Sequence, residues 1–130
     1  MLKERKNKIK DHEYFALYAN NKWGVINQAG EEVIKPAYQE MIIIPNKEKD
    51  VFICTYNINE ENGEYKTKVI NSKNEEILTE YEKVEALDNF DKNGNVWYEE
   101  KVLKVEQNGK YGLIDLNGKE LKSNIIKPHF

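Results

Sequence analysis

Short apolar runs separated by polar turn residues recur along the chain, and within each run apolar and polar positions alternate with a period of two. The clearest example is 22–34, Lys-Trp-Gly-Val-Ile-Asn-Gln-Ala-Gly-Glu-Glu-Val-Ile. A related segment occupies 110–121, and a less regular one occupies 66–78. Because successive side chains of a β-strand point to opposite faces, each segment predicts a strand, a tight turn and a second strand.

The three segments recur at a constant spacing. Ile26, Ile70 and Ile114 occupy equivalent positions, and each is 44 residues from the next. A fixed period of this length is typical of repeat architectures. We therefore predict three degenerate repeats at about 14–49, 50–99 and 100–130, which form one β domain (14–130) preceded by a charged N-terminal tail (1–13).

The turn inside each repeat has a defined chemistry. It begins with a side chain that can hydrogen-bond the backbone ahead, and three residues later it has a residue that tolerates positive φ. The pairs are Asn27 and Gly30, Asn71 and Asn74, and Asp115 and Gly118. This spacing predicts a type I turn followed by a left-handed residue. Asn20-Asn21 and Asn108-Gly109 predict additional two-residue turns, and the Asn-Gly pair suits type I′.

The pattern predicts an all-β fold, an antiparallel meander of three β-hairpin repeats of about 44 residues. Two of its strands, 39–44 and 82–87, are interpreted as fourth strands that close a repeat. Four strands per unit also describe a propeller blade, but closure requires about four to eight blades, so a rolled or stacked arrangement is expected. The expected strands are 14–19, 22–27, 31–35, 39–44, 50–56, 65–71, 75–79, 82–87, 101–107, 110–115 and 118–122.

The segment from Tyr14 to Lys122 resembles the WG-repeat family (the WG containing repeat, KWG-type). The first copy carries the resemblance through Lys-Trp-Gly-Val-Ile at 22–26, Gly30, Glu-Val-Ile-Lys-Pro at 32–36, and Tyr38. The third copy has Tyr111-Gly112, and the second has Thr67-Lys68 instead of Trp-Gly. The resemblance implies a β-rich bacterial interaction module, and it carries no catalytic motif onto this chain.

The segment 89–100 has the spacing of a calcium-binding loop. Oxygen-bearing side chains stand at positions 1, 3 and 5, Gly94 at position 6 and Glu100 at position 12. However, position 1 is Asn89 instead of aspartate, and the 44-residue period predicts a strand where a helix should follow. We therefore interpret 89–100 as a polar linker between the second and third repeats and expect no metal site there.

Other reactive residues favour structural roles. Cys54 lies in an apolar run and is interpreted as a small buried hydrophobe, while His12 and His129 lie near the ends of the chain. The paired glutamates alternate between strand faces, so they are interpreted as solvated and edge-protecting charges. No nucleophile–base pair and no phosphate-binding loop is recognised, so we expect neither an enzyme nor a cofactor.

Aromatic residues supply the candidate binding positions. Trp23 and Tyr111 share a repeat position and are predicted to lie in the core. Trp97 and Tyr98 fall outside the repeat positions, and they are expected to be exposed anchors at an interface, where such residues concentrate binding energy. Tyr38 and Tyr81 are further candidates.

The composition narrows the classes of partner. The chain has 130 residues, a net charge of −3 and a single cysteine, which favours a reducing compartment and gives no basic footprint for nucleic acid. No apolar stretch is long enough to span a membrane. We therefore expect a non-catalytic, cytoplasmic, bacterial protein that binds another protein, such as an accessory or inhibitory (immunity-like) protein, with oligomers available through edge strands. The alternative is a β-repeat that binds a small ligand, a carbohydrate or a metal.

Overall fold

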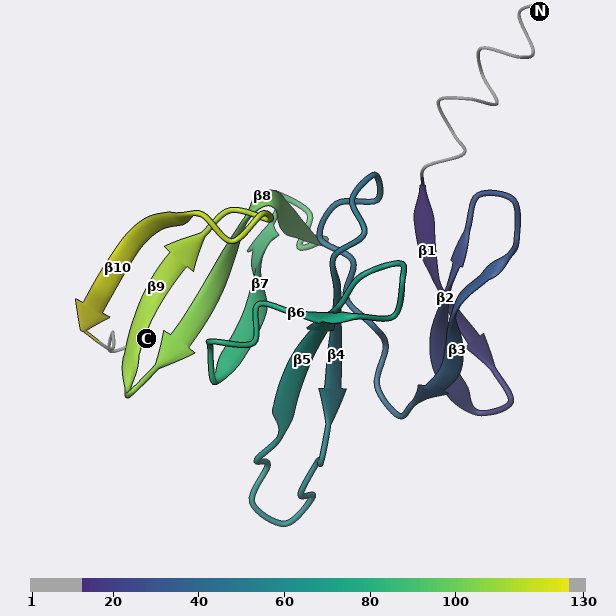
Figure 1. Cartoon of the computed structure of the whole chain (residues 1–130), viewed down its shortest axis with the longest axis horizontal. Helices are drawn as coiled ribbons and strands as arrows, with labels where there is room; N and C mark the ends of the chain where they lie inside the picture. Colours follow the sequence, from purple (N-terminus) through teal and green to yellow (C-terminus); the bar gives the residue numbers. More distant parts are fainter. Residues whose placement is uncertain (1–12, 127–130) are drawn as a thin grey trace, which may run out of the picture.

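The computed structural model describes residues 13–126, and this part of the chain contains ten β-strands and no helix (Figure 1). It therefore contains no helix with the length and apolar character needed to cross a bilayer. The expected charged tail lies outside the described residues, except for Glu13. The strands are β1 (Tyr14–Ala19), β2 (Lys22–Asn27), β3 (Glu32–Tyr38), β4 (Phe52–Tyr56), β5 (Lys66–Ile70), β6 (Glu76–Ile77), β7 (Lys83–Phe90), β8 (Val96–Gln107), β9 (Lys110–Ile114) and β10 (Glu120–Ile126).

The described strands form three antiparallel sheets, and none of these closes into a barrel. The first sheet has the order β1-β2-β3, the middle sheet β4-β5-β6, and the third sheet β10-β9-β8-β7. The three sheets follow one another along the long axis of the molecule (Figure 1). The all-β, antiparallel, stacked fold expected from the sequence is therefore confirmed.

Two hydrophobic clusters hold the sheets together, and the middle sheet contributes to both. One cluster joins it to the first sheet and includes Val25, Ile34 and Phe52. The other joins it to the third sheet and includes Val69, Leu103 and other residues of β4, β7, β8 and β9. The middle sheet is thus covered on both faces, like the buried sheets of layered folds.

The position of the middle sheet between two hydrophobic clusters explains why residues 51–54 are all apolar. Along β4, Phe52 and Cys54 pack toward the first sheet, while Val51 and Ile53 pack toward the third. All four side chains are buried, with exposed fractions between 0 and 6%. Because strand side chains alternate between faces, only a strand with a core on each side can bury four consecutive apolar residues.

The fourth strand expected at 39–44 does not form. The segment makes only one bridge, in which the backbone N–H groups of Ile43 and Ile53 each donate to the other residue's carbonyl at 3.0 Å. The reason is that this segment crosses between the clusters: Ile42 is buried in the first and Ile43 packs against the second. The run expected at 82–87 does form β7, but it pairs with β8 of the third sheet instead of closing the second repeat.

The turn residues adopt the conformations expected from their spacing. Gly30 and Gly118 have φ values of 86° and 89°, and Asn74 has a φ of 63°. In each turn the first residue's side-chain oxygen accepts two backbone N–H groups, those of Ala29 and Glu31 in the first case, at 3.0 and 2.9 Å. The two-residue turns at 20–21 and 108–109 have positive φ at both positions, as type I′ requires.

We predict that Gly118→Val destabilises the fold by more than about 1 kcal/mol, because valine is strained at a positive φ. A Cβ atom there would also approach the Leu78 Cδ2 atom to 3.0 Å. Gly94→Val is the matched control, since Gly94 has a φ of 82° with open space around it and bears only the backbone strain. Thermal melts report both effects. A Gly118→Val protein that melts with the parent would show the turn to be wrongly placed.

The Trp-Gly pair marks a close approach between two backbones. Between the pairs Trp23–Tyr38 and Val25–Ile34, β2 has one residue and β3 has three, so β3 bulges outward around Pro36. A Cβ atom at Gly24 would lie 2.4 Å from the Ile34 carbonyl oxygen and 2.8 Å from the Pro36 nitrogen. Glycine is therefore required sterically at this position.

The two other copies vary in the same place. Around Gly112, β9 and β10 again pair irregularly. The middle copy has Lys68 at this position, and its partner strand β6 contains only two residues, which pair with Val69 and Ile70 and end there. In the middle copy, which lacks this glycine, the partner strand therefore ends before it reaches the position opposite Lys68.

Candidate functional site

The segment expected to be a linker, 89–100, is instead part of a long hairpin. Asn89 and Phe90 end β7, residues 91–95 form a turn, and 96–100 begin β8. The pairing shifts between Ala86–Leu103 and Asp88–Tyr98, so three extra residues bulge from β8 at this point. We call residues 88–98, beyond this shift, the distal arm. The linker interpretation was therefore wrong.

The physical reason is a fourth copy of the repeat turn. The Asp91 carboxylate accepts the backbone N–H groups of Asn93 and Asn95 at 2.8 and 2.9 Å, and Gly94 has a φ of 82°. These hydrogen bonds, chiefly those from Asn95, hold the Asp91 pKa below its ordinary value. The oxygen donors that suggested a calcium loop therefore organise a hairpin turn. The absence of calcium binding stays a prediction.

The distal arm exposes apolar side chains on both of its faces. Phe90 is 67% exposed, Val96 52% and Trp97 47%. Phe90 and Val96 are directly opposite one another, so their side chains share one face, while Trp97 pairs with Asn89 on the other. On that second face the Asn89 Nδ2 atom donates to the Glu99 Oε1 atom at 2.8 Å.

A shallow groove runs beside the arm. It has a volume of about 700 Å³ and lies between the Ile44–Pro45 segment and the beginning of β8, with Trp97 and Tyr98 in its wall. Four charged side chains border it, two of each sign: Lys47, Lys101, Glu99 and Glu100. The groove thus combines apolar and aromatic side chains with charges of balanced sign, a mixture that protein interfaces commonly have.

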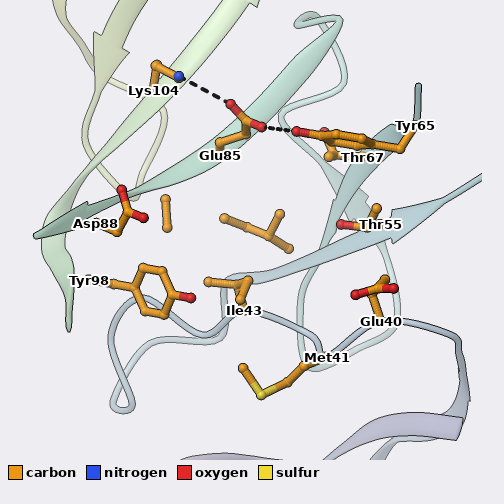
Figure 2. Close-up of a pocket in the computed structure, with 12 residues that line it drawn as sticks. Glu40, Met41, Ile43, Thr55, Tyr65, Thr67, Glu85, Asp88, Tyr98 and Lys104 are labelled. Atoms are coloured by element: carbon orange, nitrogen blue, oxygen red, sulfur yellow. Dashed lines mark hydrogen bonds and ion pairs between the residues drawn. The ribbon is translucent and has the colours of Figure 1, made fainter. Parts of the chain in front are cut away.

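A second hollow, which we call the inter-sheet cleft, opens between the middle and third sheets (Figure 2). Its volume is about 440 Å³, and β4, β5, β7, β8 and the 40–43 segment line it. Residues 40–42 do not extend the Ile43–Ile53 bridge along β4, and Glu40 and Met41 line the cleft beside it. Tyr98 lines both the cleft and the groove, so the two hollows are neighbours.

A charged network forms one wall of the cleft. The Tyr65 hydroxyl donates to the Glu85 Oε2 atom at 2.5 Å, and the Lys104 Nζ atom lies 3.3 Å from the Glu85 Oε1 atom (Figure 2). The Lys83 ammonium lies over the Tyr65 ring, 4.1 Å from its centroid. The hydrogen bond to Glu85, assisted by burial, raises the Tyr65 pKa to about 12.

This network predicts a pH-dependent contribution to stability. A tyrosine pKa raised by folding stabilises the protein fully below its ordinary value near 10, and the contribution is lost as the pH rises through about 12. Tyr65→Phe should therefore lower the free energy of unfolding at pH 8 by about 1 kcal/mol. The difference in free energy of unfolding between the parent and Tyr65→Phe, measured by urea melts, should shrink between pH 10 and 12.

Tyr98→Phe, which removes a hydroxyl from the opposite side of the same cleft (Figure 2), provides the control and should show no such narrowing. A gap that stays constant up to pH 12 would contradict the Tyr65–Glu85 hydrogen bond.

The other aromatic candidates lie against the cores. Tyr38 and Trp23 pack on the cluster between the first and middle sheets, and Tyr81 packs on the second cluster. Burial raises the Tyr38 pKa, as does its contact with the Cys54 thiol, whose own pKa is raised by burial to about 11. Tyr111 shares the repeat position of Trp23 and was also expected in the core, but it packs on neither cluster of the described residues. It is half-buried, and its ring lies 5.0 Å from the Lys104 ammonium. Of the four predicted binding residues, only Trp97 and Tyr98 therefore lie on the arm.

Sequence reasoning missed two features of the site. Phe90 and Val96 were not recognised as exposed, because they belonged to the segment interpreted as a linker. The Asp91–Gly94 spacing, identical to Asn27–Gly30, was the signal that would have identified the hairpin. The Tyr65–Glu85–Lys104 network joins residues 20 and 19 positions apart, from the residue before β5, from β7 and from β8, and no local pattern signals it.

Residues 23–45 match the family model described as the WG containing repeat. The match covers the Trp-Gly pair, the first repeat turn and the bulge around Pro36, so the resemblance seen in the first copy is confirmed. Searches of curated proteins and of solved structures found no match.

Proposed function

We propose that this chain is a non-catalytic protein-binding module and that the distal arm is its principal contact surface. One observation carries the proposal: Phe90, Val96 and Trp97 are all about half exposed or more, and they lie on one hairpin, the distal arm. Large apolar side chains gathered on a surface commonly mark protein interaction sites, and aromatic residues dominate interface energetics.

The construction of the arm supports a binding role over a structural one. Beyond the pairing shift at Ala86–Asp88, no third strand within residues 13–126 pairs with the hairpin, and the residues of both clusters lie elsewhere. The Asp91 turn nevertheless holds its tip in one conformation through three side-chain hydrogen bonds. A preorganised turn, with the apolar side chains Phe90 and Val96 on either side of it, loses little conformational entropy on binding.

We extend the proposal to cell context. The single Cys54, buried and free, suits a reducing compartment, and we assign the protein to a bacterial cytoplasm. An accessory or inhibitory role, such as that of an immunity protein, fits a small module with one projecting contact surface. In this account the partner is a protein, and neither nucleic acid nor a membrane is required.

Site-specific photocrosslinking in the source cells tests the proposal. A benzophenone amino acid replaces Trp97 in one strain and Leu121 in the other, because Leu121 is a comparably exposed apolar residue, 51% exposed, on β10. We expect a discrete adduct with one polypeptide from position 97 and none from position 121. An adduct at twice the mass of the chain would identify a second copy as the partner. No adduct, or the same adducts from both positions, would contradict the proposal.

A further inference from the structure

The inter-sheet cleft has a composition that selects its ligand. Part of its lining is apolar, formed by Ile43, Ile53 and Ala86, which belong to or pack on the core between the two sheets. Three carboxylates and one ammonium group line its mouth: Glu40, Glu85, Asp88 and Lys104. A cleft whose charges are mainly of one sign concentrates the opposite charge at its entrance.

The four charges are not equivalent. Glu85 is already paired with Lys104 at 3.3 Å and accepts the Tyr65 hydroxyl, so this wall is neutral and its hydrogen-bonding capacity is largely used. Glu40 and Asp88 are exposed, and neither has an ion-pair partner within the described part of the chain. The net charge offered to a ligand is therefore that of these two carboxylates.

The two carboxylates are placed on opposite sides of the hollow. Figure 2 shows Asp88 and Tyr98 on one side and Glu40 on the other, with Ile43 between them. The Tyr98 ring extends toward the interior from the Asp88 side. An elongated cation can therefore contact a carboxylate at its charged end, lay its aliphatic stem on the apolar floor and approach an aromatic ring.

We propose that the inter-sheet cleft binds an alkyl guanidinium or alkyl ammonium group. Guanidinium suits this site best, because it binds carboxylates through two parallel hydrogen bonds and stacks on aromatic rings. A volume of about 440 Å³ falls within the range of small-ligand sites. The site accepts either a free organic cation or the side chain of a protein. It shares Asp88 and Tyr98 with the distal arm, but Phe90, Val96 and Trp97 do not line it.

Nuclear magnetic resonance titration at constant ionic strength tests this site with three probes. Agmatine represents a free cation, N-acetyl-Ala-Arg-Ala-amide represents an arginine side chain, and N-acetyl-Ala-Glu-Ala-amide is the anionic control. We expect saturable amide shifts at Thr55, Ala86 and Tyr98 with at least one cationic probe, at a dissociation constant on the order of 1 mM. Saturation by agmatine alone identifies a free cation as the source, and saturation by the arginine peptide identifies a protein side chain.

Two double variants distinguish binding in the cleft from general charge attraction. Glu40→Gln with Asp88→Asn should weaken binding at least tenfold. Glu48→Gln with Glu100→Gln removes the same net charge from two exposed positions outside the cleft and should leave the dissociation constant within about twofold of the parent's. An equal loss in both double variants would reduce the effect to general charge attraction and overturn the proposal.

Failure to saturate with either cation, or equal shifts with the anionic peptide, would also overturn it. These outcomes are separate from the crosslinking result at position 97. The arm can bind a protein when the cleft takes no cation, and the cleft can take a cation when no protein crosslinks to the arm.

Discussion

Replacing Phe52 with alanine is expected to lower the free energy of unfolding by about 3–5 kcal/mol. Phe52 is fully buried on β4, in the cluster that joins the first sheet to the middle one. Its ring meets the Tyr14 ring edge to face, with centroids 5.1 Å apart. Because small domains have a total stability of about 5–15 kcal/mol, this one truncation should remove a large part of it.

Phe90→Ala is the matched control, since the same atoms are removed from a side chain that is 67% exposed. Its effect should lie within about 0.5 kcal/mol of zero. Urea unfolding of both variants measures the difference directly. Equal losses would mean that the arm is packed like a core element, which would contradict both the stacked-sheet fold and the assignment of the arm as a free surface.

Gly24→Ala is expected to be the next most damaging change, with a cost of about 3 kcal/mol. The new methyl group would collide with the backbone of β3, at 2.4 Å from the Ile34 carbonyl oxygen and 3.0 Å from the Pro36 Cα atom. Neither atom belongs to a flexible side chain, so β2 and β3 must separate and give up hydrogen bonds at the bulge.

Gly63→Ala separates this steric cause from ordinary glycine conformational effects. Gly63 has a φ of 76° and nothing within 4 Å of its ideal Cβ position, so alanine there should cost only about 1 kcal/mol. Chemical denaturation compares the two. If Gly63→Ala proves the more destabilising, the Trp-Gly pair does not owe its glycine to the close approach of β3.

The strands and turns were predictable because they depend on local chemistry. The period-two pattern gave β1 and β2 at the bounds that the structure has, and the Asn–Gly spacing identified the left-handed turn residues. Long-range placement was not predictable in the same way. Residues 39–44 have the composition of a strand, yet Ile42 and Ile43 pack in different clusters. The segment therefore forms only the β-bridge between Ile43 and Ile53.

The candidate site was predictable only in part. Trp97 and Tyr98 were recognised because they fall outside the repeat positions. Phe90 and Val96 were missed because the segment 89–100 was interpreted as a polar linker. The expected repeat count and 44-residue period stay predictions, since the family match covers a single copy. The turn at Asp91 also repeats the same hydrogen bonding outside that period, which shows that the turn chemistry is not confined to one position in each repeat.

The most direct test of the central claim, that the distal arm is the protein-binding surface, is the dissociation constant of the crosslinked partner measured by isothermal titration calorimetry. Trp97→Ala should raise it about 30-fold, the effect of losing an interface hot spot of about 2 kcal/mol. Leu121→Ala, which truncates a side chain 51% exposed on β10, should change it less than about threefold. Equal dissociation constants for the parent and Trp97→Ala would contradict the claim.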